Sequence, residues 1–204
     1  MKSYSAIAAD MVLEAARGHG AETRLLDLRR ARLPMYDPDA ETSNHEGVRE
    51  ATEAVNWADA FLLTTPDYHG SVSGMLKNFL DFYWEEFAGK LFGYVCASHE
   101  KGLTVMEQMR TSVRQCYGWS LPYGVSIHGE KDLNASGEIV NAQVKRRLLM
   151  LSRDLVVYGS LIRSQFQADL ASGTTETFAA RYAVGPLLSF HAGLRHAPPN
   201  VGVD

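Results

Sequence analysis

The hydrophobic residues of this chain alternate between helical and strand-like spacing over its first three quarters. Apolar residues three or four positions apart predict helices over about 4–15, 46–57, 72–87, 106–117 and 140–155. Short apolar runs predict strands over 23–28, 60–65, 91–97 and 125–128. The segment 32–41, which holds Pro34 and Pro38, is expected to be a loop.

Helices and strands in alternation, with almost continuously apolar strands, indicate a parallel sheet buried on both faces. We therefore predict a doubly wound α/β fold with three layers over residues 1–158. The pattern fades after Gly159. We expect residues 159–204 to form a C-terminal extension that packs on this domain or on a partner subunit.

Composition narrows the class of protein further. The 204 residues carry 20 Lys and Arg against 24 Asp and Glu, a net charge of −4, which argues against a nucleic-acid or membrane-surface partner. No apolar run reaches the length of a membrane helix, and Asp10 and Glu14 interrupt the first apolar segment, so we expect no leader and a cytoplasmic protein. Cys96 and Cys116 are too few for a disulfide framework or a metal site, and we expect buried thiols.

The segment after the second predicted strand is the richest in chemistry. It reads Thr-Pro-Asp-Tyr-His-Gly-Ser over 65–71 and continues into a helix. In open α/β sheets ligands bind beyond the carboxyl ends of the strands, and small residues there let the backbone approach a flat ligand. A planar heterocycle suits this loop. The alternative is that Ser71 or Ser73 caps the helix and that Tyr68 and His69 lie on the surface.

Residues 65–78 resemble the flavin-contacting loop of the NADPH-dependent FMN reductase family, a flavodoxin-like group that includes chromate, quinone and azo reductases. The match runs through the Pro, Tyr, His and Gly positions to the Lys77-Asn78 pair, with Asp67 in place of the family's Glu. The resemblance covers roughly 2–158. It implies a flavodoxin-like fold that binds FMN without a covalent bond.

The resemblance also assigns cofactor-binding residues. The family positions that match Pro66, Asp67, Tyr68, His69 and Gly70 wrap the isoalloxazine ring, mostly through the backbone. Ser98 is expected at the pyrimidine edge of the flavin. Ser3, Tyr4 and Ser5 are expected at its phosphate. Where the family has glycines after Ser98, this chain has His, Glu and Lys at 99–101, which makes that loop bulkier. Ser3 and Ser5 are equally suited to cap the first helix.

The activity that the resemblance implies is hydride transfer from NADPH or NADH to FMN, followed by transfer of electrons to a small acceptor. That acceptor is a quinone, a free flavin, an azo compound or a metal oxyanion. Because the cofactor carries the chemistry, we name no catalytic proton-transfer residue. Because family members are commonly dimers or tetramers, the resemblance implies that this protein is a homodimer or homotetramer. The alternative is a noncatalytic flavodoxin-like electron carrier, or a truncated paralogue without cofactor.

One departure from the family concerns the sheet. Family members open with a strand that leads into the phosphate loop, and this chain matches only the end of that loop at 2–5. In the strand order 2-1-3-4-5 the absent strand lies between the next two, so the segments near Leu25 and Leu62 are expected about 9 to 10 Å apart with unpaired backbone groups between them. Residues upstream of Met1, a segment of the tail, or closure of the two strands are the three ways to resolve this gap.

Overall fold

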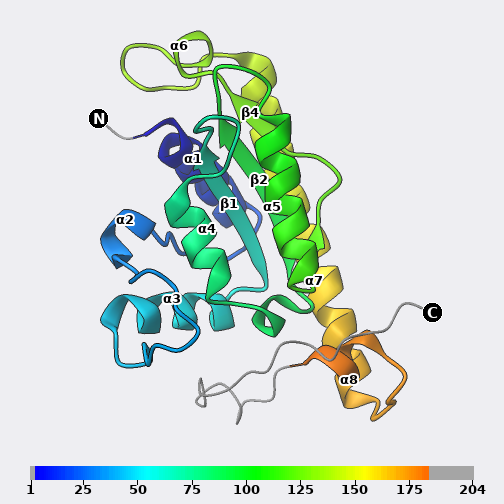
Figure 1. Cartoon of the computed structure of the whole chain (residues 1–204). Helices are drawn as coiled ribbons and strands as arrows, with labels where there is room; N and C mark the ends of the chain where they lie inside the picture. Colours follow the sequence, from blue (N-terminus) through cyan, green and yellow to red (C-terminus); the bar gives the residue numbers. More distant parts are fainter. Residues whose placement is uncertain (1–2, 184–204) are drawn as a thin grey trace, which may run out of the picture.

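The computed structural model describes residues 3–183 (Figure 1). Its α-helices are α1 (Tyr4–Gly18), α2 (Leu28–Ala31), α3 (Glu46–Trp57), α4 (Gly74–Asp81), α5 (Leu103–Gln115), α6 (Gly129–Asp132), α7 (Ala142–Ala171) and α8 (Phe178–Tyr182). A 3-10 turn, η1, spans Glu85–Phe87. The strands are β1 (Ala60–Pro66), β2 (Leu91–Ala97), β3 (Trp119–Ser120) and β4 (Val125–Ile127).

The strands form one parallel sheet with β2 at its centre. β1 pairs with β2 along its whole length, from Ala60 opposite Leu91 to Pro66 opposite Ala97. On the other side of β2, β3 pairs with its first residues and β4 with its last. Parallel strands joined by helices confirm the α/β fold predicted from the hydrophobic pattern.

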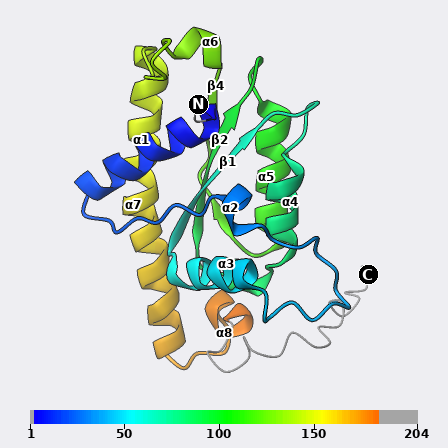
Figure 2. The same ribbon diagram turned by 90° about the vertical axis from the view of Figure 1, so that its left-hand side faces the viewer.

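Helices cover both faces of this sheet, as Figure 2 shows. α1 and α7 lie on one face, where Val12, Leu148 and Leu151 pack against Val95. α3, α4 and α5 lie on the other face, where their apolar side chains form a second buried cluster with β1 and β2. The predicted three layers are therefore present.

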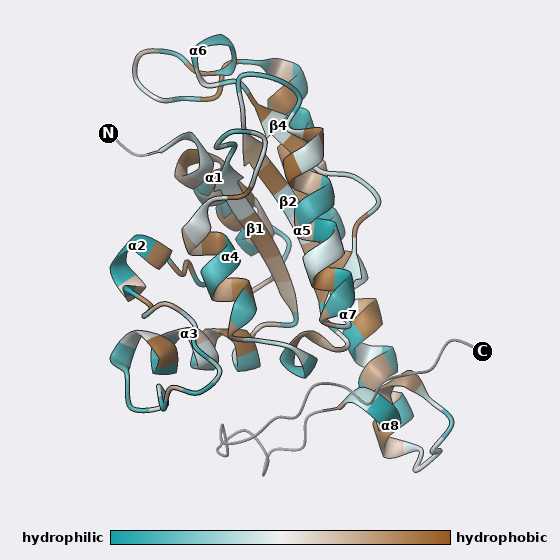
Figure 3. Ribbon diagram, in the orientation of Figure 1, coloured by the Kyte–Doolittle hydropathy of each residue, from teal (hydrophilic) through white to brown (hydrophobic). Residues whose placement is uncertain are grey.

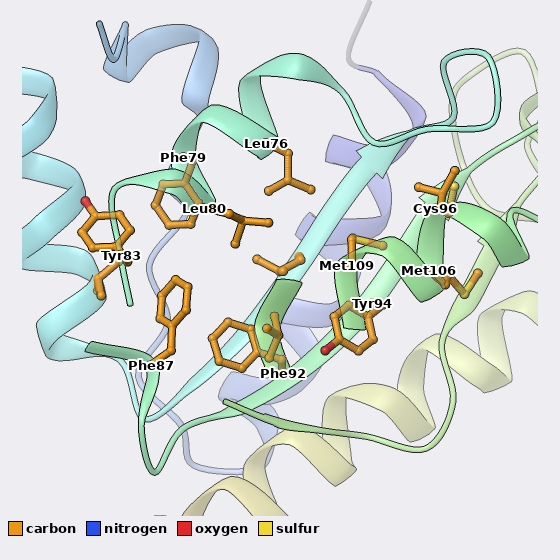
Figure 4. Packing of buried hydrophobic residues seen from close by; sticks show 14 of the residues in the cluster. Leu76, Phe79, Leu80, Tyr83, Phe87, Phe92, Tyr94, Cys96, Met106 and Met109 are labelled. Atoms are coloured by element: carbon orange, nitrogen blue, oxygen red, sulfur yellow. The ribbon is translucent and has the colours of Figure 1, made fainter. Parts of the chain in front are cut away.

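The core surrounds β1, β2 and β4, whose residues are mostly hydrophobic (Figure 3). Beside the second cluster Phe61 stacks on Phe92 with ring centroids 4.7 Å apart. Within it Phe87 meets Phe92 edge-on at 4.9 Å (Figure 4). The fully buried rings of Phe87 and Phe92 each contribute roughly 1.5–3 kcal/mol from removal of their surface from water. This packing fixes β1 and β2, whose ends carry the candidate site.

Two predicted elements are wrong. Residues 23–28 are not a strand, because no strand in the described residues lies beside them to pair with their backbone; the chain instead crosses over to α2, which begins at Leu28. The helix predicted over 72–87 is shorter: Ser73 caps α4, which ends at Asp81, and the chain then bends into η1. The bend lets Phe87 turn inward against the rings of β1 and β2.

The last long helix continues past the point where the hydrophobic pattern fades. α7 runs to Ala171, and Gly159 lies within it, where a Cβ would meet the Cβ of Ala60 at 3.0 Å. The small residue thus marks a close approach to β1 and not the end of the helix. α8 then packs back through Ala179 against Phe166. Residues 184–204 lie outside the described residues, so the division into 1–158 and 159–204 stays a prediction.

Candidate functional site

The carboxyl ends of β1, β2 and β4 meet at one edge of the sheet, together with the N-terminus of α1. An open cavity of about 1450 Å³ begins at this edge and continues along β1. The predicted cofactor-binding residues that line it are Ser3, Tyr4, Ser5, Pro66, Asp67, Tyr68 and Ser98. His69 and Gly70 continue the turn from Tyr68. The fold therefore brings together residues that are almost a hundred positions apart in the sequence.

The turn at residues 68–71 is tight and unusual in its backbone. The amide of Tyr68 donates to the carbonyl of Ser71 at 3.0 Å, and the amide of Ser71 donates back to the carbonyl of Tyr68 at 3.1 Å. His69 and Gly70 between them have φ values of 58° and 76°, a left-handed conformation that costs a non-glycine residue roughly 1 kcal/mol or more. The side chain of Tyr68 is 61% exposed. The turn thus presents an aromatic side chain and an open backbone to the cavity edge.

Asp67 joins this turn to the next loop. One carboxylate oxygen accepts from the amide of Gly70 at 2.8 Å, and the other accepts from the hydroxyl of Ser98 at 2.8 Å. That hydroxyl in turn accepts from the amide of Glu100 at 3.1 Å. The side chains of Asp67 and Ser98, both predicted to contact the cofactor, here hold the two loops in register.

Gln108 is a residue of the site that the sequence analysis missed. From α5 its Oε1 accepts from the hydroxyl of Ser71 at 3.0 Å and from the amide of Val72 at 3.2 Å, while its Nε2 donates to the carbonyl of Gly70 at 3.2 Å. In the sequence Gln108 stands three positions after Val105 and next to Met109, at the border of an apolar stripe. A single amide at such a border was the available signal.

At the start of α1, Ser3 caps the helix, as the alternative to phosphate binding predicted. The hydroxyl oxygen of Ser3 accepts from the amide of Ala6 at 3.3 Å, which makes Ser3 the N-cap, and lies 3.2 Å from the hydroxyl of Ser5. The ring of Tyr4 packs on Gly129, where a Cβ would lie 2.0 Å from the ring. The free amides and positive dipole end of this 15-residue helix face the same cavity, which suits a phosphate.

The loop after β2 carries the departure from the family. His99 is exposed at its tip, and its ring meets that of His128, after β4, edge-on with centroids 5.4 Å apart. The Nδ1 atom of His128 is buried and has no hydrogen-bond partner within residues 3–183. Gly102, with φ of 59°, lets α5 start beside Cys96, whose Sγ would lie 2.8 Å from an added Cβ.

These residues fit FMN. The turn with Gly70 and the exposed side chain of Tyr68 suits one edge of a planar ring, and the start of α1 supplies the phosphate end. The unpartnered Nδ1 atom of His128 belongs to a ring that contacts His99, which lines the cavity. Cys96 lies below this edge, where burial and the nearby Asp67 charge raise the pKa of its thiol to about 12, so it is protonated and unreactive.

Across residues 3–183 no three His, Cys, Asp or Glu side chains gather closely enough to hold a metal ion. Over the same range no helix is both long and apolar enough to cross a bilayer.

Known proteins resemble this chain in sequence and in fold. An NADPH azoreductase from Bacillus sp. strain OY1-2 is 32% identical over 111 residues, which cover 53% of this chain and 62% of that enzyme. An NAD(P)H-dependent FAD/FMN reductase from Geobacillus thermodenitrificans is 25% identical over 66% of this chain and 74% of its own length. The chain thus spans about two thirds of the length of these relatives. The solved NAD(P)H:(acceptor) oxidoreductase FerB from Paracoccus denitrificans shares the fold with a TM-score of 0.66 at 20% identity, covering 78% of this chain and 91% of that chain.

The family profile of the NADPH-dependent FMN reductases matches residues 1–132, well over half of the chain. This match confirms the resemblance first noted in the loop at 65–78, and with it the flavodoxin-like fold and the prediction of FMN and NAD(P)H as cofactors. The chain belongs to the NADPH-dependent FMN reductase family.

Proposed function

We propose that this protein is an NAD(P)H-dependent oxidoreductase that passes electrons through bound FMN to a small acceptor, such as an azo compound, a quinone, a free flavin or a metal oxyanion. The observation that carries the proposal is the left-handed turn at His69 and Gly70, braced by Asp67 and Gln108 at the mouth of the cavity. When bound, FMN would supply the redox chemistry, accepting a hydride from NAD(P)H and passing the two electrons to the acceptor.

The protein's own part is to hold and orient two flat molecules. We expect the backbone of residues 66–70 to bound one edge of the ring site, since residues 66–68 line the cavity. Ser98 holds the neighbouring loop to this one through its bond to Asp67. The start of α1, with Ser3 and Ser5, supplies the amides for the phosphate. Tyr68 and His69 stand where the second substrate would arrive, since Tyr68 is the exposed aromatic side chain of this turn.

Gly70→Val tests the ring site, and the chain offers a matched control. Gly70 and Gly173 both have left-handed backbone, with φ of 76° and 68°, and at both an added Cβ meets nothing within 4 Å. Valine therefore costs similar backbone strain at either place, but only residue 70 belongs to the turn that follows the cavity-lining residues 66–68. We expect Gly70→Val to abolish FMN binding and Gly173→Val to keep it, measured by quenching of flavin fluorescence. Equal FMN affinity in the two variants would contradict the proposed site.

Turnover of NADPH distinguishes the proposed enzyme from the two alternatives, an electron carrier and a paralogue without cofactor. Oxidation of NADPH that needs both this protein and an added azo dye or quinone supports the enzyme. Binding of FMN without such turnover would leave an electron carrier, and failure to bind FMN would leave the paralogue. We further propose a cytoplasmic homodimer or homotetramer, which light scattering coupled to size-exclusion chromatography tests.

A further inference from the structure

The mouth of the cavity, at the carboxyl edge of the sheet, carries two exposed apolar side chains. Tyr68, in the turn after β1, and Met75, in the first turn of α4, both line the cavity. Tyr68 is 61% exposed and Met75 is 50% exposed. A tyrosine ring and a flexible thioether side by side with a cavity suit a flat apolar ligand, because both offer apolar surface that such a ligand can cover.

The same mouth lacks permanent positive charge in the part of the chain that the structure describes. The described residues that line it, none of them lysine or arginine, are 3–6, 66–68, 73, 75, 76, 97–99 and 129. Asp67 brings a carboxylate to this set. His99 is its one basic side chain, and an imidazole carries no permanent charge. An anion that enters here meets a carboxylate and no guanidinium or ammonium group to pair with.

The arginines that line the rest of the cavity are engaged by other groups. Arg163 pairs with the carboxylate of Asp59, just before the start of β1, at 3.1 Å. The guanidinium of Arg24 lies over the ring of Trp57, 4.2 Å from its centroid, and Arg29 pairs with the aspartate two residues before it at 2.7 Å. These arginines therefore bring no unpaired positive charge to the mouth at Tyr68.

Two lysines stand near the mouth in the sequence without lining it. Lys77, on α4, pairs with Asp81. Lys101, after β2, follows Glu100, whose charge is opposite. Neither lysine changes the negative balance that Asp67 gives to the lining residues.

We infer that the acceptor reduced at this site is an uncharged aromatic molecule, a quinone or an uncharged azo compound, and that Met75 is a residue that sets this preference. The inference rests on the proposed function and narrows its acceptors. A metal oxyanion or a sulfonated dye brings negative charge next to Asp67 without a cation to compensate it. An uncharged flat acceptor instead covers the apolar surface of Tyr68 and Met75.

The reaction itself sets no demand for a cation at the mouth when the acceptor is uncharged. A quinone takes up a hydride, supplied by NAD(P)H through the flavin, and one proton from water, and becomes the hydroquinone, while NAD(P)H is oxidised to NAD(P)⁺. The phosphates of FMN and of NAD(P)H lie far from the reacting rings of these molecules, so the charge argument concerns the acceptor alone.

The test compares naphthoquinone with naphthoquinone sulfonate and with chromate, using the FMN-loaded protein and NADPH. We expect kcat/KM of the wild type to be about tenfold higher for the uncharged quinone than for its sulfonate. Met75→Lys adds a positive charge at an exposed helix position and should raise kcat/KM for the sulfonate and for chromate about fivefold. The matched control is Met150→Lys, because Met150 is 45% exposed on α7 and does not line the cavity. It should leave all three values unchanged.

Binding is measured apart from turnover, by the change in flavin absorbance when each quinone is added to the oxidised, FMN-loaded protein. Met75→Ser removes apolar surface without adding charge, so it should weaken the binding of both quinones by a similar factor, about threefold. Met75→Lys should tighten the binding of the sulfonate alone.

Two results would overturn the inference and leave the proposed function standing: equal kcat/KM for the two quinones in the wild type, or equal effects of Met75→Lys and Met150→Lys on the sulfonate and chromate. If the FMN-loaded wild type oxidises NADPH with none of these acceptors, the proposed function is wrong and the inference is wrong with it.

Discussion

Replacing Gln108 by leucine should loosen the turn at the mouth of the cavity. The amide group of Gln108 makes three hydrogen bonds to residues 70–72, from 3.0 to 3.2 Å long. At about 1 kcal/mol net for each bond, their loss weakens the turn by at most about 3 kcal/mol. The paired amides of Tyr68 and Ser71 and the bond from Gly70 to Asp67 remain. We therefore expect about half of that loss to reach the ligand, which makes FMN binding roughly tenfold weaker.

The assay is titration of FMN fluorescence with three variants. Gln108→Glu keeps an acceptor for Ser71 and Val72 but loses the donor to Gly70, so its affinity should lie between those of the wild type and Gln108→Leu. Gln143→Leu alters an exposed glutamine on α7 and should leave the affinity unchanged. If Gln108→Leu binds FMN within about twofold of the wild type, the turn does not depend on Gln108 and the argument fails.

Three further predictions concern stability and reactivity. Gly47→Ala should destabilise the fold by about 3 kcal/mol or more in chemical denaturation, because the added Cβ would lie 1.8 Å from a backbone oxygen of α2. The control Gly18→Ala has open space at that position and should be neutral or stabilising. Similar stabilities of the two variants would contradict this packing. Cys96 and Cys116, whose pKa values burial raises to about 12 and about 11, should resist alkylation at pH 8 until the protein is denatured, and rapid labelling of the native protein would count against it. Burial, together with repulsion from Arg163, lowers the pKa of Lys90 from 10.5 to about 8. Between pH 8 and 10.5 the unfolded chain therefore binds more protons than the folded one, so the free energy of unfolding of the wild type should rise with pH relative to that of Lys90→Met. A difference between the two proteins that stays constant over this range would refute the prediction.

The sequence predicts the buried parallel strands well because they leave an unambiguous pattern. Residues 60–65 and 91–97 are short apolar runs bounded by polar or turn-forming residues, and both become strands within a residue of the predicted bounds. The loop after β1 could also be predicted as a ligand-binding loop from the sequence, because Pro66, Tyr68, His69 and Gly70 form a rare combination at the end of a strand. These features depend on local sequence alone.

The features that escaped the sequence depend on partners far along the chain. Residues 23–28 have the composition of a strand, but a strand forms only where another strand offers its edge, and the local pattern does not report that. The last helix was predicted only to about residue 155, whereas α7 continues to Ala171 through Gly159, which lies close to Ala60. Gln108 acts on a turn 36 to 38 positions away, and only the packing of α5 beside that turn reveals its role.

We propose above all that the turn at Tyr68, His69 and Gly70 holds a flavin that NAD(P)H reduces. The most direct measurement is anaerobic titration of the FMN-loaded protein with NADPH, followed by the flavin absorbance, with Gly70→Val and Gly173→Val beside it. We predict that the wild type and Gly173→Val bleach on addition of NADPH and regain colour with an azo dye or quinone, while Gly70→Val retains no flavin to bleach. A wild-type protein that retains no FMN, or a Gly70→Val protein that bleaches like the wild type, would contradict the account.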